Sequence, residues 1–201
     1  ARNAAGAAPV QEQIAAIKGV ASNDELAAMI ASLQKQGVRS YFGMYIGADE
    51  KNSSMNLLQF SQGGLSMGDR DYYLLDDETS VKIRTAYKEY MNKLFTLAGY
   101  SEADAAASTD AVLGLETEIA KISVDRGTLR DVHKNYNKMP LKDFVKKYNF
   151  INWDVYMKEV GIKNSTEVNA SQVTFFEALT KLLKKVSLDT QKEYLVFKLL
   201  N

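Results

Sequence analysis

Residues 80–99 read Ser-Val-Lys-Ile-Arg-Thr-Ala-Tyr-Lys-Glu-Tyr-Met-Asn-Lys-Leu-Phe-Thr-Leu-Ala-Gly, and this stretch decides the fold class. Its apolar residues recur every three or four positions, at Ile83, Tyr87, Tyr90, Leu94 and Ala98. This spacing is typical of one face of an amphipathic helix. Gly99 follows directly, and glycine suits the left-handed backbone that commonly ends a helix. The stretch therefore predicts a long helix over about residues 80–98.

Helical signals continue on both sides of this stretch. Upstream, Ser22 and Glu25 fit a capping box, and the apolar spacing that follows stops near Gly37. Downstream, Ser101 and Asp104 open another helix whose apolar stripe runs to residue 122. Further helices are expected over about residues 141–147, 152–160, 172–185 and 187 to the end, with Ser187 as an N-cap. We therefore predict a mainly α, multi-helix domain over residues 1–201.

One region breaks the helical pattern. Residues 41–46 and 55–60 are rich in aromatic and apolar side chains, and residues 49–54 between them are turn-forming. This arrangement predicts one β-hairpin over about residues 41–60. Only two prolines occur in the chain, which agrees with a helix-rich fold.

The composition excludes several classes of chemistry. The chain has 201 residues, 25 Lys+Arg, 25 Asp+Glu, one His and no Cys. Without Cys there are no disulfides, thiolate metal sites or cysteine nucleophiles, and one His allows no two-His metal motif. Balanced charge argues against nucleic-acid binding. Residues 1–9 lack a signal-peptide layout, and no apolar run approaches the roughly 20 residues of a membrane span.

The candidate chemical groups have simple structural interpretations. Residues 69–71 read Asp-Arg-Asp, which is compatible with a general acid–base pair of carboxylates. An arginine that bridges acids in a loop is the simpler interpretation, and it applies equally to Arg130 and Asp131. His133 has no neighbours at metal-ligand spacing, so we interpret it as a surface or hydrogen-bonded residue.

Two further sets of polar residues are interpreted as surface. The last two predicted helices carry lysines at positions that we expect to face water, namely Lys181, Lys184, Lys185, Lys192 and Lys198. Three asparagines stand in Asn-x-Ser/Thr sequons and are taken as polar surface, namely Asn52, Asn164 and Asn169. Neither set indicates a nucleic-acid or membrane site.

Several strings in order along the chain nevertheless resemble the neprilysin and endothelin-converting-enzyme family of zinc metallopeptidases. Residues 49–53 are similar to its Asp-x-Lys-Asn-Ser turn, and residues 115–120 to its Leu-Glu-x-x-Ile-Ala helix. Its Arg-Asp-Tyr-Tyr element is matched by Arg70, Asp71, Tyr72 and Tyr73. Its Arg-Asp…Tyr-Asn-Lys-Met element is matched by residues that include Arg130, Asp131, Tyr136 and Asn137. Its Trp-x-x-Tyr element begins at Trp153. Departures include Gly68 for a usual Pro and Phe197 for a usual Trp.

The resemblance implies a cap-lobe fragment of a larger, two-lobe peptidase. The catalytic lobe of such enzymes carries His-Glu-x-x-His, whose zinc activates water, and that motif does not occur in these residues. No catalytic or metal-binding residue is therefore assigned, and no cofactor is expected in this piece. The motif residues named above are expected to organise loops and contacts with the catalytic lobe. The start without Met and the stop at Asn201 within an apolar stretch also fit a piece of a longer chain.

The same resemblance carries expectations about partners and location. The partners are the catalytic lobe of the same chain and the oligopeptides that the parent cleaves, with neither nucleic acid nor a membrane span. An extracytoplasmic location follows from the family, with the cytoplasm as the alternative. Absence of Cys favours a bacterial member, because animal relatives rely on disulfides. The competing hypothesis is a standalone helical interaction module without enzymatic activity.

Overall fold

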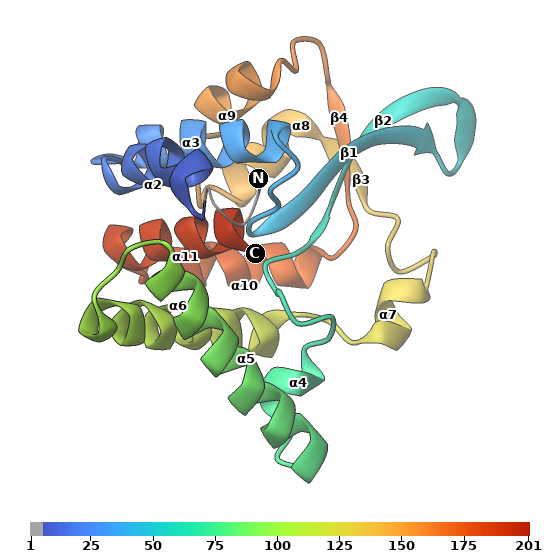
Figure 1. Ribbon diagram of the computed structural model, residues 1–201. Coiled ribbons are helices and arrows are strands. Elements are labelled where there is room, and N and C mark those ends of the chain that lie inside the picture. Colours follow the sequence, from blue (N-terminus) through green and yellow to red (C-terminus); the bar gives the residue numbers. More distant parts are fainter. Residues whose placement is uncertain (1–5) are drawn as a thin grey trace.

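The computed structural model describes residues 6–201, and helices dominate it (Figure 1). The helices are η1 (Ala8–Val10, a 3-10 turn), α2 (Gln11–Lys18), α3 (Asn23–Lys35), α4 (Asp71–Leu74), α5 (Glu78–Leu97), α6 (Glu102–Ile122), α7 (Arg126–Arg130), α8 (Leu141–Lys147), α9 (Trp153–Val160), α10 (Val173–Leu183) and α11 (Leu188–Leu200). The strands are β1 (Phe42–Asp49), β2 (Asn52–Gln62), β3 (Lys138–Pro140) and β4 (Glu167–Ala170). The predicted mainly α class is confirmed. Residues 1–5 lie outside this description, and they are part of the segment that is predicted not to form a signal peptide.

Side-chain caps set most of the helix starts. The predicted long helix is α5, and it begins two residues early because the Asp77 carboxylate accepts the backbone N–H of Ser80 at 3.0 Å. The predicted caps at Ser22, Ser101 and Ser187 each accept a backbone N–H three residues ahead. Gly99 closes the turn after α5 with φ +94°. Local sequence therefore fixes these boundaries.

The sheet is larger than the predicted hairpin. Its strand order is β1-β2-β4-β3, with β2 and β4 parallel and the other two pairs antiparallel. The hairpin is confirmed but its turn is tighter than expected, since Asp49 already pairs with Asn52. The predicted hairpin is therefore present, and the two further strands, β3 and β4, were not predicted because they are too short to show a periodicity. Helices α2, α4 and α7 were likewise not predicted.

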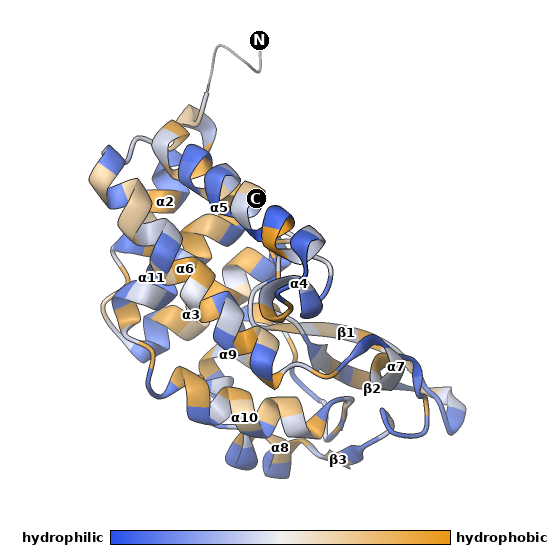
Figure 2. Cartoon of the chain, turned by 90° about the horizontal axis from the view of Figure 1, so that it is seen from below, coloured by the Kyte–Doolittle hydropathy of each residue, from blue (hydrophilic) through white to orange (hydrophobic). Residues whose placement is uncertain are grey.

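Aromatic side chains join the sheet to the helices. Phe42 of β1 lies 5.4 Å, centroid to centroid, from both Trp153 and Tyr156 of α9. Phe60 of β2 stacks on Phe144 of α8 at 4.7 Å. Figure 2 shows apolar residues on the inner faces of the helices and a hydrophilic turn at the far end of the hairpin. The packed end of the hairpin is therefore fixed, while its tip projects from the helical body (Figure 1).

None of the described helices is long and apolar enough to span a bilayer.

Candidate functional site

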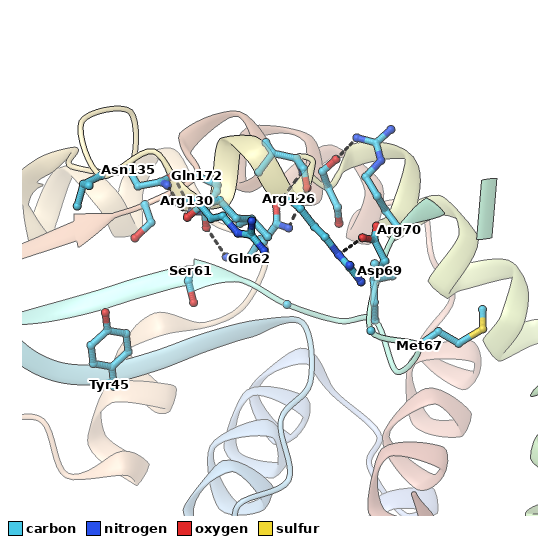
Figure 3. Close-up of a pocket in the computed structure, with 18 of the residues that line it drawn as sticks. Tyr45, Ser61, Gln62, Met67, Asp69, Arg70, Arg126, Arg130, Asn135 and Gln172 are labelled. Carbon is cyan, nitrogen blue, oxygen red and sulfur yellow. Dashed lines mark hydrogen bonds and ion pairs between the residues drawn. The ribbon is translucent and has the colours of Figure 1, made fainter. Parts of the chain in front are cut away.

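A cleft of about 460 Å³ opens between the hairpin, the loop after β2 and helix α7 (Figure 3). It is lined by Tyr45 and Ser61 of the hairpin, Asp69 and Arg70 of the loop, Arg126 and Arg130 of α7, and Asn135 and Gln172 behind them. Two of the motifs that carry the family resemblance, Arg-Asp-Tyr-Tyr and Arg-Asp, therefore meet at one cleft. Concave, partly polar surfaces of this kind are the usual places for ligands.

A buried carboxylate anchors the loop side of the cleft. Glu116 of α6 is fully buried, and its Oε1 accepts Ser66 Oγ at 2.6 Å. Its Oε2 accepts the hydroxyls of Tyr73 at 2.8 Å and Tyr87 at 2.6 Å. The Nζ of Lys198 lies 3.1 Å from Oε1. One carboxylate thus joins the loop, α4, α5 and α11, and a buried polar group with this many partners rigidifies its surroundings. We call these five residues the Glu116 network.

Lys198 corrects an expectation from the sequence. Its side chain is only 7% exposed, so the prediction that it faces water is wrong. Burial lowers the pKa of Lys198, and the Glu116 charge opposes that shift. The sequence carried a signal that was missed, because Glu116 and Lys198 both fall among apolar residues at helical spacing. A charge on an otherwise apolar stripe indicates a buried pair.

The Arg-Asp-Tyr-Tyr loop forms one wall of the cleft itself. The Asp69 carboxylate accepts the backbone N–H of Asp71 at 3.0 Å and pairs with the guanidinium of Arg126 (Figure 3). Arg70 donates from Nη1 to the carbonyl oxygen of Ser123. Two of the three arginines at the cleft therefore have partners inside the chain.

A second carboxylate anchors the hairpin. Asp49, at the end of β1, has a side chain only 3% exposed. It accepts the Lys51 backbone N–H at 3.0 Å, the Tyr136 hydroxyl at 2.9 Å and the Lys138 ammonium at 3.1 Å. Two family motifs far apart in the sequence, the Asp-x-Lys-Asn-Ser turn and Tyr-Asn-Lys-Met, thereby contact each other. We call Asp49, Lys51, Tyr136 and Lys138 the Asp49 network.

A group of amide side chains lies behind the cleft and joins neighbouring segments of the chain. Asn169 of β4 is 1% exposed, so its interpretation as polar surface is wrong. Its Oδ1 accepts the backbone N–H of Asn137 at 2.6 Å, and its Nδ2 donates to Gln59 at 2.9 Å. Gln172 accepts the backbone N–H of Gln62 at 2.8 Å. These bonds join β2, β4 and the segment after α7 behind the cleft.

The remaining predicted residues are spread around these networks. The carbonyl oxygen of Tyr72 accepts Arg84, and Asp131 accepts the backbone N–H of Lys134. Trp153 lies in the aromatic core, where its indole N–H donates to the Tyr148 carbonyl at 2.7 Å. Their predicted contacts with a catalytic lobe stay predictions.

The residues present do not fit a zinc ion. Catalytic zinc takes three protein ligands and structural zinc usually four. Along residues 6–201, no three His, Cys, Asp or Glu side chains cluster closely enough to hold a metal. The single histidine, His133, is exposed. No chemical step through a metal is therefore assigned to these residues.

Comparison with known proteins identifies the family. A family model described as peptidase family M13, for its N-terminal region, matches residues 1–201. The chain therefore belongs to this family of zinc metallopeptidases.

Individual relatives agree with this assignment. Neprilysin-3 of Drosophila melanogaster is 35% identical over 131 residues, which is 63% of this chain and 17% of that protein. Endothelin-converting enzyme 1 of Mus musculus is 32% identical over 133 residues, 66% of this chain and 17% of that protein. The chain thus spans about a sixth of these curated relatives.

Solved structures give the same fold. The Mycobacterium tuberculosis zinc metalloprotease Zmp1, in complex with an inhibitor, superposes with a TM-score of 0.91 at 27% identity. That match covers 98% of this chain and 30% of Zmp1. PepO of Lactobacillus rhamnosus matches with a TM-score of 0.75 at 17% identity, which supports the fold alone.

Proposed function

We propose that this chain is a non-catalytic wall of a zinc metalloendopeptidase that cleaves oligopeptides, and that it restricts which substrates reach the cavity. One observation carries the proposal. The family match spans all 201 residues, whereas residues 6–201 hold no group of side chains suited to a metal. In this proposal the zinc and the water-activating residues belong to another part of the same longer protein.

The packing of the chain supports a wall that is rigid within itself. The Glu116 and Asp49 networks each tie several elements to one carboxylate next to the cleft. A rigid wall excludes large folded substrates by shape, and it shields the reaction from bulk water once a peptide is inside. The partners in this proposal are the catalytic lobe and oligopeptide substrates. The extracytoplasmic location, taken from the family resemblance, is proposed with it.

Two measurements test this function. The purified chain, incubated with zinc and a mixture of oligopeptides, is expected to release no products by mass spectrometry. The intact parent enzyme, given peptides of increasing length and then a folded protein, is expected to show a sharp upper size limit. Robust cleavage by the chain alone would overturn the non-catalytic assignment. A parent that degrades folded proteins as fast as short peptides would overturn the gating role.

Reading the coding sequence beyond Asn201 separates the proposal from its alternative. A downstream His-Glu-x-x-His within a few hundred codons is expected, because that motif supplies two zinc ligands and the general base. A stop codon shortly after Asn201 would instead favour a standalone interaction module.

A further inference from the structure

The cleft contains one arginine, Arg130, that has neither an ion pair nor a hydrogen bond among residues 6–201. Arg126 pairs with Asp69, and Arg70 donates to the Ser123 carbonyl and lies 4.0 Å from the carboxylate of Asp71. Arg130 lines the same cleft, and along residues 6–201 its guanidinium has no ion pair or hydrogen bond. A planar guanidinium with free donors suits a carboxylate, which it can bind through two parallel hydrogen bonds.

The backbone beneath Arg130 is held in place. Asn135 donates from Nδ2 to the carbonyl oxygens of Thr128 at 2.8 Å and Leu129 at 3.0 Å, so it fixes the end of α7. Gln172 donates to Asn135 Oδ1 at 2.8 Å and joins this segment to β2. The guanidinium is therefore presented from a fixed support, which reduces the conformational entropy lost on binding.

Exposed apolar side chains line the cleft beside this cation. Tyr45 is 58% exposed, Val132 58% and Leu129 41%, and all three line the cleft together with Arg130. Figure 3 shows the Tyr45 ring on the hairpin wall and Arg130 on the facing wall. Tyrosine supplies a large contact area at low entropic cost and is enriched at binding surfaces. Among the described residues, the cleft thus combines an unpaired guanidinium with an apolar surface, and Glu50 at the hairpin turn is the acidic residue that lines it besides Asp69.

We propose that this cleft binds an acidic oligopeptide segment, with a carboxylate on Arg130 and an adjacent apolar side chain against Tyr45 and Val132. The carboxylate is either an Asp or Glu side chain or a free C-terminus, since both present the same two oxygens. The inference rests on the proposed function for the choice of a peptide as ligand. It assigns no part of the cleavage reaction to the cleft.

An NMR titration of the ¹⁵N-labelled chain at low salt tests the proposal with three peptides. The first is acetyl-Ala-Leu-Glu-Leu-Ala-amide, whose only carboxylate is the side chain. The second has Gln for Glu and a free C-terminal carboxylate, and the third has Gln and an amide, so it carries no carboxylate. We expect the first, the second or both to shift the amides of residues 126–135 and 61–63. The third is expected to bind at least tenfold more weakly than the peptide that binds best.

Matched variants locate the charge. Arg130→Gln is expected to weaken binding of the best peptide at least tenfold, because it removes a charge-assisted hydrogen bond to the carboxylate. Arg130→Lys should recover part of this loss, because lysine keeps the positive charge but cannot form two parallel hydrogen bonds to one carboxylate. Lys82→Gln removes one exposed charge from α5 and should leave affinity unchanged.

Three results would overturn the inference. They are shifts confined to other surfaces, equal binding of the carboxylate-free peptide, and equal loss of affinity in Arg130→Gln and Lys82→Gln. A failure here leaves the wall function standing, since that function depends on cleavage by the parent and not on peptide binding to the isolated chain.

Discussion

Two carboxylates hold the two sides of the cleft with the same kinds of partner but in different surroundings. Glu116 is fully buried, and its lysine, Lys198, is 7% exposed. The Asp49 side chain is almost as buried, yet the side chain of its lysine, Lys138, is 29% exposed and also pairs with Glu167 at 2.9 Å. The surroundings of the lysine therefore differ more than those of the acid.

The pKa values of the two lysines consequently shift in opposite directions. Burial lowers the pKa of Lys198, whereas hydrogen bonds to Glu167 and Asp49 raise the pKa of Lys138. A buried ion pair stabilises little in itself, but removal of one partner strands the other without water. When one partner of a solvent-exposed ion pair is removed, the remaining charged group is still hydrated. We therefore expect the loss of one partner to destabilise the fold more in the Glu116 network than in the Asp49 network.

Removal of the Glu116 charge should have the largest effect. Glu116→Gln keeps the shape but leaves the Lys198 ammonium buried without its anion. The free energy of unfolding is expected to fall by about 3–5 kcal/mol in urea denaturation. A loss no larger than that of a surface substitution would erase the contrast between the two networks.

Removal of the stranded charge should restore part of that stability. In Glu116→Gln combined with Lys198→Met, no buried ammonium remains, and the methionine fills a similar volume. The double variant is expected to be about 1–3 kcal/mol more stable than Glu116→Gln alone, because residues in one network are strongly coupled. Simple additivity of the two single variants would show that they do not act as a pair.

The two tyrosines of the Arg-Asp-Tyr-Tyr motif provide a matched test. The Tyr73 hydroxyl donates to Glu116 and accepts the backbone N–H groups of Ser66 and Met67 at 3.2 and 3.0 Å. Tyr73→Phe leaves the backbone N–H groups of Ser66 and Met67 without this acceptor and should lower the free energy of unfolding by about 1–3 kcal/mol. Tyr72→Phe is the control, with an expected change within about 0.5 kcal/mol. Equal losses would contradict the assigned geometry.

Asp49→Asn should have the smallest effect of the series, and one that depends on pH. The Lys51 backbone N–H, with smaller contributions from Lys138 and Tyr136, holds the pKa of Asp49 below its ordinary value against the opposing effect of burial. A depressed folded pKa gives stability that is present above about pH 4 and is lost as the pH falls through the folded pKa. Wild type and variant should therefore differ at neutral pH and converge in acid. A pH-independent difference would show that the Asp49 charge is not what stabilises the hairpin.

Local signals in the sequence predicted most of the helices. Ser101 and Ser187 act as caps through contacts three residues away, so short-range patterns locate them. The hairpin was also found locally, from its two apolar runs around a polar turn. The family resemblance rested on motifs whose order and spacing are likewise visible in the sequence.

Contacts between residues far apart in the sequence could not be predicted from such local patterns. Strand β4 pairs with β2 across about 110 residues, and its four residues carry no periodicity. Lys198 and Asn169 were assigned to the surface because polarity usually predicts exposure, and tertiary contacts overrode that tendency in both. Nothing in the sequence indicates that, among residues 6–201, Arg130 lacks a partner while Arg126 pairs with Asp69.

Amide hydrogen exchange on Tyr73→Phe and Asp49→Asn, measured side by side, tests the central claim that each carboxylate holds its own side of the cleft. Tyr73→Phe is expected to speed exchange in residues 64–75, and Asp49→Asn in residues 47–53 and 136–140, with little crossover. Faster exchange across both sides in either variant, or in neither side, would contradict the claim.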